Sequence, residues 1–403
     1  MSGYPPLLEV EELRVTVRRD GAELTVLDGV SLAVGAGQCL GVVGESGCGK
    51  SLTLRAVMGL LPPGARTTGG EVRLSPRDGS AAVPVPAGGA AGAGLAMVFQ
   101  DSHGSLDPTM RVGTFLAGVI RHTGASRSRT GDARDAPVGR AAARRRAVEL
   151  LEAVGVPDPE LRLRAYPHEL SGGMRQRVAI ALALATEPRV LLCDEPTTAL
   201  DVTLQAEILR LLDAARSGRG LGMVFVSHDI GVVRQVADVV AVMYAGQVVE
   251  AGPVEDVLAR PRHPYTRALL EAAPTLTAPP TVGTPPTHGT PPTHGTPPSP
   301  GAPPPLGEPL SPGTRPALGA PRERFRPILG APPSPADYTA GCRFGPRCSG
   351  HEAACAVTIR GLDARLPGHR SSCVHDQPPA GRSSSPGGPG PHHTRDDQGV
   401  EAG

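Results

Sequence analysis

The stretch GESGCGKS, residues 44–51, places the strongest limit on how this chain can fold. It follows QCLGVV, residues 38–43, a short apolar run typical of a strand buried on both faces, and it precedes a helical pattern from about Lys50 to Leu61. Three glycines let the backbone curl, so that successive N–H groups point inward at the helix start and form a cradle for an anion. The candidate phosphate-binding residues are Gly44, Glu45, Ser46, Gly47, Cys48, Gly49, Lys50 and Ser51.

Lys50 is the only lysine of the 403-residue chain, in which Lys and Arg together number 40. A compact ammonium on a flexible stem can reach between two phosphates of a nucleotide, whereas a planar guanidinium is wider and holds its donors in a fixed fork. Arginine can replace an exposed lysine at little cost, but not a lysine in such a place. The solitary lysine therefore indicates a phosphate-binding loop, in which Ser51 offers its hydroxyl to Mg²⁺.

The composition divides the chain into regions. Residues 1–273 carry dense Val, Leu, Ala and Ile patterns that can bury a core, whereas residues 274–335 are rich in Pro, Gly and Thr and repeat the motif GTPPTH. We expect a first domain over 1–273, a stiff linker over 274–335, a small cysteine-containing module over 336–377 and a disordered tail over 378–403.

Charge and hydropathy restrict the partners and the location. The formal net charge of +1 leaves no overall field that would draw the chain onto nucleic acid or anionic lipid. The acidic N-terminus does not resemble a signal peptide, and no apolar run approaches the ~18–20 residues that span a bilayer. Eight arginines between Arg121 and Arg146 are typical of a solvated helix and loop. The pattern predicts a cytoplasmic protein that reaches a membrane only through its partners.

Apolar patterning predicts an α/β domain. Residues 7–17 and 24–34 alternate as two strands of a hairpin, and residues 75–94, rich in Pro, Gly and Ala, are expected to form a loop. Later in the chain, buried strand patterns alternate with helical ones, which is typical of a largely parallel sheet. The predicted strands are 189–193, 222–227 and 239–243, the last followed by a hairpin through Ala245–Gly246–Gln247, and the predicted helices are 140–155, 175–186, 202–215 and 229–237.

Two further segments carry candidate site residues. In VLLCDEPTTALD, an apolar strand ends at Asp194, which can hold Mg²⁺ through water, and at Glu195, which can polarise an attacking water. LSGGMRQR begins a helix at Ser171, Gly172 and Gly173, either as an ordinary capped start or as a second anion-binding helix N-terminus. One nucleotide does not need two such cradles from one chain, so the second one predicts two chains that face each other head to tail.

In combination these motifs resemble the ATP-binding cassette (ABC) family across residues 7–255. GESGCGKS matches its Walker A motif, LSGGMRQR its signature and VLLCDEP its Walker B motif. Gln100 in MVFQD matches the Q-loop, Ala199–Leu200–Asp201 the D-loop, and His228 in VFVSHD the switch histidine. The resemblance implies an ABC-type P-loop domain with a mixed sheet and a helical subdomain, and ATP and Mg²⁺ as its ligands.

The resemblance also implies residue roles. The catalytic set would be Glu195, His228 and Lys50, and the Mg²⁺ set Ser51, Gln100 and Asp194. The phosphate loop of one chain would hold the nucleotide, and Ser171, Gly172 and Gly173 of the partner would cover its γ-phosphate. Gln100 and Asp201 would also belong to the nucleotide-binding set. The family stacks adenine on an aromatic residue, but the matching position here is Val17, so adenine stacking is weaker or is supplied by another group.

Two segments resemble the oligopeptide, dipeptide and nickel importer branch of this family: YPHELSGGMRQR at 166–177 and RHPYTRALLEAAP at 262–274. A cysteine-bearing tail is also typical of the branch, and some of its members carry a 4Fe–4S cluster there. From the residues alone, four thiolates suit an iron–sulfur cluster or Zn²⁺, and a module without metal also fits. The candidate ligands are Cys342, Cys348, Cys355 and Cys373, with His369 and His375 as alternatives.

The leading functional hypothesis is an ATP-hydrolysing subunit that couples ATP to the uptake of di- or oligopeptides, or of nickel. It would lie peripherally at the cytoplasmic face of the membrane with a second cassette, identical or different, two permease subunits and an extracytoplasmic solute-binding protein. The alternative is a soluble non-transport ABC ATPase with a metal-binding C-terminal module. The single cassette and the near-zero net charge count against ABC ATPases that act on ribosomes or DNA.

Overall fold

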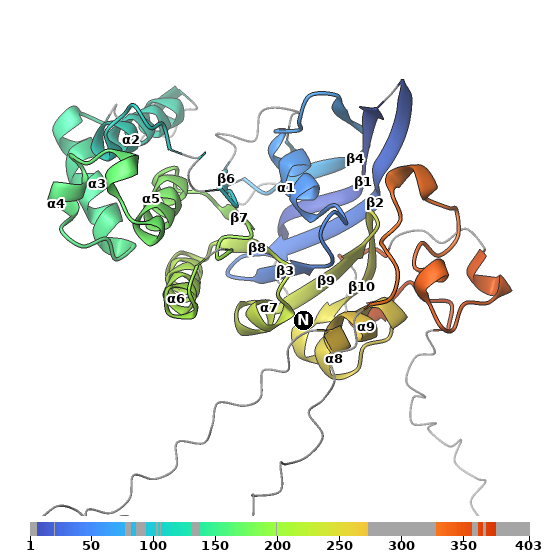
Figure 1. Cartoon of the computed structure of the whole chain (residues 1–403). Coiled ribbons are helices and arrows are strands. Elements are labelled where there is room, and N and C mark those ends of the chain that lie inside the picture. The colour runs from blue at the N-terminus through green and yellow to red at the C-terminus, as the bar shows by residue number, and fades with distance from the viewer. Residues whose placement is uncertain are drawn as a thin grey trace, which may run out of the picture.

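The computed structural model describes residues 6–19, 21–76, 82–85, 94–101, 104, 106–129, 138–198, 200–272, 328–356, 362–365 and 368–375. These residues form two sheets, a group of helices beyond one edge of the larger sheet and a C-terminal segment beside its other edge (Figure 1). The C-terminal segment comprises the described residues 328–356, 362–365 and 368–375. Most of the predicted linker, with its GTPPTH repeats, and the predicted tail from 378 lie outside the described residues.

The larger sheet has seven strands in the order β11-β10-β9-β3-β8-β7-β6. Its central strands β9, β3, β8, β7 and β6 run parallel, while β10 and β11 continue it in antiparallel fashion. Every residue of β3, β7 and β8 is buried, so the largely parallel sheet and the hairpin through Gly246 are as predicted. The strands are β3 Cys39–Val43, β6 Leu95–Val98, β7 Val190–Asp194, β8 Gly222–Ser227, β9 Val239–Tyr244, β10 Gln247–Pro253 and β11 Arg370–Ser371.

The smaller sheet is antiparallel, with the order β2-β1-β4-β5. Its strands are β1 Pro6–Arg19, β2 Ala22–Gly35, β4 Ala65–Leu74 and β5 Val83–Pro84. The predicted hairpin of the first two strands is confirmed, but β5 falls within the stretch 75–94 that was predicted to be a loop. Two residues are too few to give a periodic pattern, and β5 exists because Val83 pairs with Leu74 at the end of β4.

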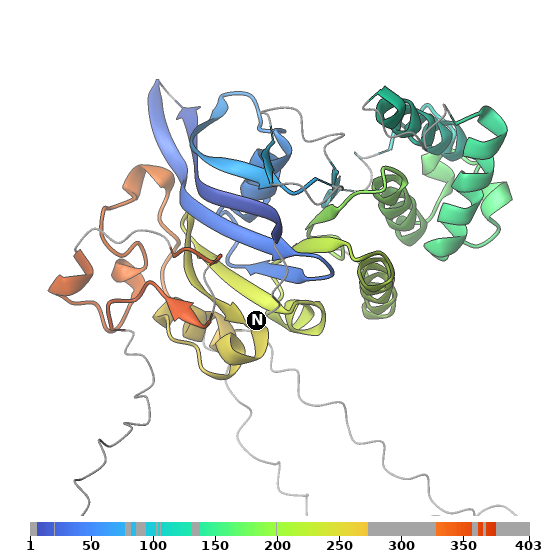
Figure 2. The ribbon, with the colours of Figure 1, turned by 180° about the vertical axis from the view of Figure 1, so that it is seen from behind.

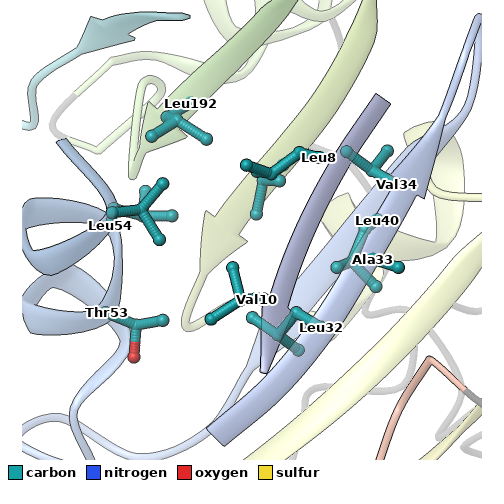
Figure 3. Close-up of a pocket in the computed structure, with 11 residues that line it drawn as sticks. Leu8, Val10, Leu32, Ala33, Val34, Leu40, Thr53, Leu54 and Leu192 are labelled. Atoms are coloured by element: carbon teal, nitrogen blue, oxygen red, sulfur yellow. The ribbon is translucent and has the colours of Figure 1, made fainter. Parts of the chain in front are cut away.

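Apolar side chains fill the space where the two sheets face each other and α1, Lys50–Met58, packs between them (Figure 3). Leu8 and Leu32 come from the antiparallel sheet, Leu40 and Leu192 from the parallel one, and Leu54 from the helix. The predicted helix end at Leu61 is wrong, because Gly59, at φ +70°, ends the helix and bonds its N–H to the carbonyl of residue 56. This core fixes the start of α1, and with it the phosphate loop.

The helices α2, α3 and α5 pack on one another beyond the β6 edge, as both views show (Figures 1 and 2). Arg144 and Arg145 are exposed on α3, as predicted for a solvated arginine-rich stretch. No helix in the described part of the chain is long and apolar enough to cross a membrane. The helices are α2 Val112–Arg129, α3 Arg140–Ala153, α4 Pro159–Arg162, α5 Gly172–Ala185, α6 Val202–Arg219, α7 Ile230–Val236, α8 Val254–Ala259 and α9 Pro264–Ala272, with a 3₁₀ turn η1 at Pro167–Glu169.

The C-terminal segment packs against β2, β10 and α9, where Figures 1 and 2 show it in orange. It is held by short turns rather than by long elements: η2 Pro335–Asp337, η3 Gly345–Arg347 and η4 Ala353–Ala356. Phe344 is buried, and its ring centroid lies 5.3 Å from that of Tyr244 and 5.4 Å from that of Tyr265. The cassette and the C-terminal segment therefore share one continuous apolar core at this edge.

A buried carboxylate adds a polar tie to the same contact. Glu250 on β10 is fully buried and accepts hydrogen bonds from the backbone N–H groups of Arg262 and His263, while its Oε1 lies 2.6 Å from Nε2 of His369. Burial lowers the pKa of His263 to about 4, so this imidazole is neutral at pH 7, and its Nδ1 accepts the N–H of Tyr265. Glu250 of β10 therefore ties the start of the HPYTR segment, residues 263–267, to His369 of the C-terminal segment.

Candidate nucleotide-binding site

The predicted site residues lie at the carboxyl ends of four neighbouring strands. The phosphate loop follows β3, Gln100 follows β6, Asp194 and Glu195 stand at the end of β7, and His228 follows β8. These four strands are parallel, so their carboxyl ends share one edge of the sheet. Ligands of open α/β sheets bind at that edge.

The phosphate loop is shaped by its glycines. Gly47 has φ +80°, a left-handed conformation that favours glycine. A Cβ on Gly44 would lie 2.2 Å from the carbonyl oxygen of Met243, so the loop passes directly over β9. No side chain caps the N-terminus of α1 at Gly49, which leaves its first N–H groups directed at the loop. This geometry fits the anion cradle that the sequence predicts.

The Lys50 side chain folds into this loop. Its ammonium donates to the carbonyl of Gly44 at 2.7 Å and to that of Glu45 at 3.0 Å, and it lies 3.8 Å from Sγ of Cys48. The residue is only 5% exposed. The amine is therefore held against the loop backbone.

Ser51 and Asp194, 143 residues apart in sequence, are in direct contact. The Ser51 hydroxyl donates to Oδ1 of Asp194 at 2.7 Å. Burial raises the pKa of Asp194, which is 1% exposed. A hydroxyl and a carboxylate are the hard oxygen ligands that Mg²⁺ prefers. The pair fits the predicted Mg²⁺ position beside the phosphate loop.

Glu195 gathers three partners at one oxygen. Its Oε2 accepts from Nε2 of Gln100 at 3.1 Å and from the Thr198 hydroxyl at 2.9 Å, and it lies 3.0 Å from Nδ1 of His228. Glu195 also has φ +47°, a strained conformation for a non-glycine residue. The fold thus joins the three predicted residues Gln100, Glu195 and His228 into one cluster.

Two contacts of the site have no signal in the sequence. Thr198 follows Glu195 by three residues in DEPTT, a position that identifies a turn but not the direction of its hydroxyl. Tyr265 stands in the HPYTR motif, and its hydroxyl accepts the backbone N–H of Glu45 at 2.7 Å. The two residues are 220 apart, so only the tertiary structure could reveal this contact.

The signature residues lie apart from this cluster. They begin α5, which Figures 1 and 2 place in the helical group, away from α1. Ser171 caps that helix by accepting the N–H of Met174, and Asp201 caps α6 by accepting the N–H of Leu204. Gly173 packs on Leu204, whereas a Cβ at Gly172 would meet nothing within 4 Å. Ala199 of the predicted D-loop lies outside the described residues.

Val17, the position predicted to lack the adenine-stacking aromatic, pairs with Leu24 across the β1–β2 hairpin and with Ala65 on β4. It is only partly buried. The first hairpin therefore provides the expected backbone position, but Val17 offers no aromatic ring on which adenine could stack.

The four C-terminal cysteines line one small cavity, together with His263 and His375. None of the chain's seven cysteines, all of them described, forms a disulfide. In the part of the chain that the structure describes, no three His, Cys, Asp or Glu side chains come close enough to hold a metal ion. His375 lies 3.8 Å from Sγ of Cys355, but His369 contacts Glu250 instead, so His369 is not placed as an alternative ligand.

The space around Lys50 makes a sharp prediction. Lys50→Arg keeps the charge but puts a wider, forked group between two loop carbonyls and the Cys48 thiol. We expect its affinity for MgATP to fall by at least about tenfold, or roughly 1.4 kcal/mol, close to the loss in Lys50→Ala. Isothermal titration calorimetry measures this, and wild-type affinity in Lys50→Arg would contradict the size argument.

Comparison with known proteins identifies the family and the fold. Family models match residues 27–198 as "ABC transporter" and residues 249–302 and 313–355 as "Oligopeptide/dipeptide transporter, C-terminal region". A dimeric structure of the ATP-binding cassette MJ0796, in a post-hydrolysis state with ADP and Pi, is similar with a TM-score of 0.50 and 26% identity over 61% of this chain and 98% of that one. The predicted ABC fold, with its mixed sheet and helices, is confirmed.

Relatives at higher identity cover nearly the whole chain. The oligopeptide transport ATP-binding protein OppD of Mycobacterium tuberculosis is 40% identical over 380 residues, 94% of this chain but 53% of OppD, so the chain spans about half of that relative's length. The dipeptide transport ATP-binding protein DppD of Bacillus subtilis is 42% identical over 374 residues, 92% of this chain and 95% of DppD. The chain therefore belongs to the ABC transporter family, in the branch of the oligopeptide and dipeptide transport ATP-binding proteins.

Proposed function

We propose that this chain binds and hydrolyses MgATP and couples the reaction to the import of oligopeptides or dipeptides through separate permease subunits. The observation that carries the ATPase is the cluster of Gln100, His228 and Thr198 around Glu195, on the same sheet edge as the Ser51–Asp194 pair. The cargo class follows from the names of the relatives, which are oligopeptide and dipeptide transport proteins.

Each residue then has a chemical role. The loop N–H groups and Lys50 bind the β- and γ-phosphates, and Ser51, Gln100 and Asp194 hold Mg²⁺, which when bound neutralises phosphate charge. Glu195 polarises the attacking water, and His228 orients that water and the γ-phosphate. The contact of His228 and Gln100 with one carboxylate oxygen supports these roles, because all three groups reach the same point.

A second cassette completes the site. Ser171, Gly172, Gly173 and Asp201 of one chain would cover the nucleotide held by the other. The exposure of Ser171 and Gly172 supports this arrangement, as does their separation from the phosphate loop of their own chain. The dimer of the similar ADP-bound cassette also supports it. The partner is a second copy or a related chain.

The remaining partners follow from the proposed transport. We place the chain peripherally at the cytoplasmic face of a membrane, with two permeases and an extracytoplasmic solute-binding protein. We retain the domain division proposed from the sequence: the cassette over 1–273, a linker over 274–335, a cysteine module over 336–377 and a tail over 378–403. The names of the relatives favour transport over the alternative of a soluble non-transport ATPase.

The cysteine module would hold a 4Fe–4S cluster on Cys342, Cys348, Cys355 and Cys373. All four line one cavity. Four thiolates are the ligand set of a 4Fe–4S cluster and also of a structural Zn²⁺ site. Such a cluster would stabilise a module of short turns.

Removing the proposed catalytic carboxylate tests the hydrolysis. Glu195→Gln keeps the shape and the contact with Thr198 but cannot polarise water as a carboxylate does. We expect nucleotide binding to persist, turnover to fall about 10²–10³-fold, and a closed dimer to accumulate with ATP. Phosphate release and size-exclusion chromatography measure these effects. Unchanged turnover would remove Glu195 from its role.

Gly172→Asp tests dimer formation without disturbing the fold of the single chain. A side chain there meets open space, and an acidic residue in the first turn of α5 favours the helix. We expect normal stability and normal nucleotide binding, but no ATP-driven dimer in the Glu195→Gln background and no turnover in the wild-type background. Gly172→Ala is the matched control and should still dimerise. A dimer formed by Gly172→Asp would argue against the shared site.

Metal analysis tests the cysteine module. Protein purified without oxygen should be brown and contain about four iron and four sulfide per chain. Cys342→Ser should lose this iron, whereas Cys39→Ala, which changes a buried cysteine of the cassette, should keep it. Stoichiometric zinc without iron would show that the module binds Zn²⁺ and not a cluster. Protein without either metal would show that the module holds no metal.

A further inference from the structure

An arginine of the C-terminal segment forms an ion pair with a residue of the phosphate loop. Arg347 Nη1 donates to Oε2 of Glu45 at 2.6 Å and Nη2 donates to Oε1 at 2.9 Å. This is a two-pronged pair between a planar guanidinium and a carboxylate, the strongest geometry for such ions. The Arg347 side chain is 4% exposed and that of Glu45 is 22% exposed, so water screens the pair little.

Arg347 is itself fixed in place. Its Nε donates to the carbonyl of Leu329 at 2.9 Å, and its Nη1 lies 3.2 Å from the hydroxyl of Tyr244. It belongs to the turn η3, directly before Cys348. The guanidinium therefore reaches Glu45 from a rigid support rather than as a mobile surface side chain.

Glu45 connects this support to the phosphate-binding groups. Its N–H is held by the Tyr265 hydroxyl, and its carbonyl accepts from the ammonium of Lys50 at 3.0 Å. Arg347 thus fixes the side chain of a residue whose two backbone groups are both engaged at the site. Without the arginine, the Glu45 carboxylate would stand uncompensated beside a loop that must receive a triphosphate, and like charges repel.

We propose that Arg347 is a positioning residue of the nucleotide site: through Glu45 it holds the first turn of the phosphate loop and cancels a negative charge next to the bound phosphates. The inference rests on the proposed binding of MgATP. It makes the C-terminal segment a working part of the nucleotide site, although Arg347 follows the end of the cassette at residue 273 by more than 70 residues of sequence.

The test compares four variants of the full chain, purified without oxygen. Arg347→Ala should weaken MgATP binding about 5- to 20-fold and raise KM while kcat changes little, as expected for lost ground-state binding. Arg347→Lys keeps the charge without the fork and should recover part of the loss. Arg365→Ala is the matched control: Arg365 pairs with Glu11 and Asp363 in the same C-terminal region and does not touch the loop, so its affinity should equal that of the wild type.

The fourth variant separates positioning from simple folding. Adding Glu45→Gln to Arg347→Ala removes the stranded charge, so the double variant should bind MgATP more tightly than Arg347→Ala alone. A purely structural role for Arg347 predicts that the double variant binds MgATP no more tightly than Arg347→Ala and that the melting temperature falls in parallel with the affinity. That outcome, or wild-type affinity in Arg347→Ala, would overturn the inference. If the wild type itself failed to bind MgATP, the proposed function would fall first.

Discussion

The parallel alignment of β3, β6, β7 and β8 is the constraint on which the rest of the molecule depends. It brings residues from positions 44 to 228 to one sheet edge, where Ser51 meets Asp194 and Glu195 meets His228. The strands can run parallel because helices cross over between them and bury both faces. The apolar packing between the sheets in turn fixes α1, so the loop before it has a stable base.

The site is assembled from two directions. The larger sheet positions the phosphate loop and the carboxylates at its edge. The HPYTR segment and the C-terminal turns bind Glu45 through Tyr265 and Arg347. The same contact region contains the shared aromatic core of Tyr244, Tyr265 and Phe344 and the buried carboxylate of Glu250. Arg347, which holds Glu45, directly precedes Cys348 of the cysteine cavity.

Some of the site could be predicted from sequence because it lies in local motifs. Lys50, Ser51, Asp194, Glu195 and His228 each follow a recognisable apolar strand, and strand ends on one edge must meet. Other parts had no local signal. Thr198 resembles any turn residue, β5 is two residues long, and His369 flanks a cysteine in sequence yet binds Glu250 in space.

The sequence by itself determined the class of protein through three motifs: a glycine-rich loop that only a lysine fits, an acidic strand end, and a second helix start suited to a partner chain. These motifs depend on residues that are neighbours in the chain and on the freedom of their own backbone. The tertiary structure alone decided what surrounds them. The grip of Arg347 on Glu45 joins positions 302 residues apart, and such a contact depends on how distant segments pack, which no local pattern encodes.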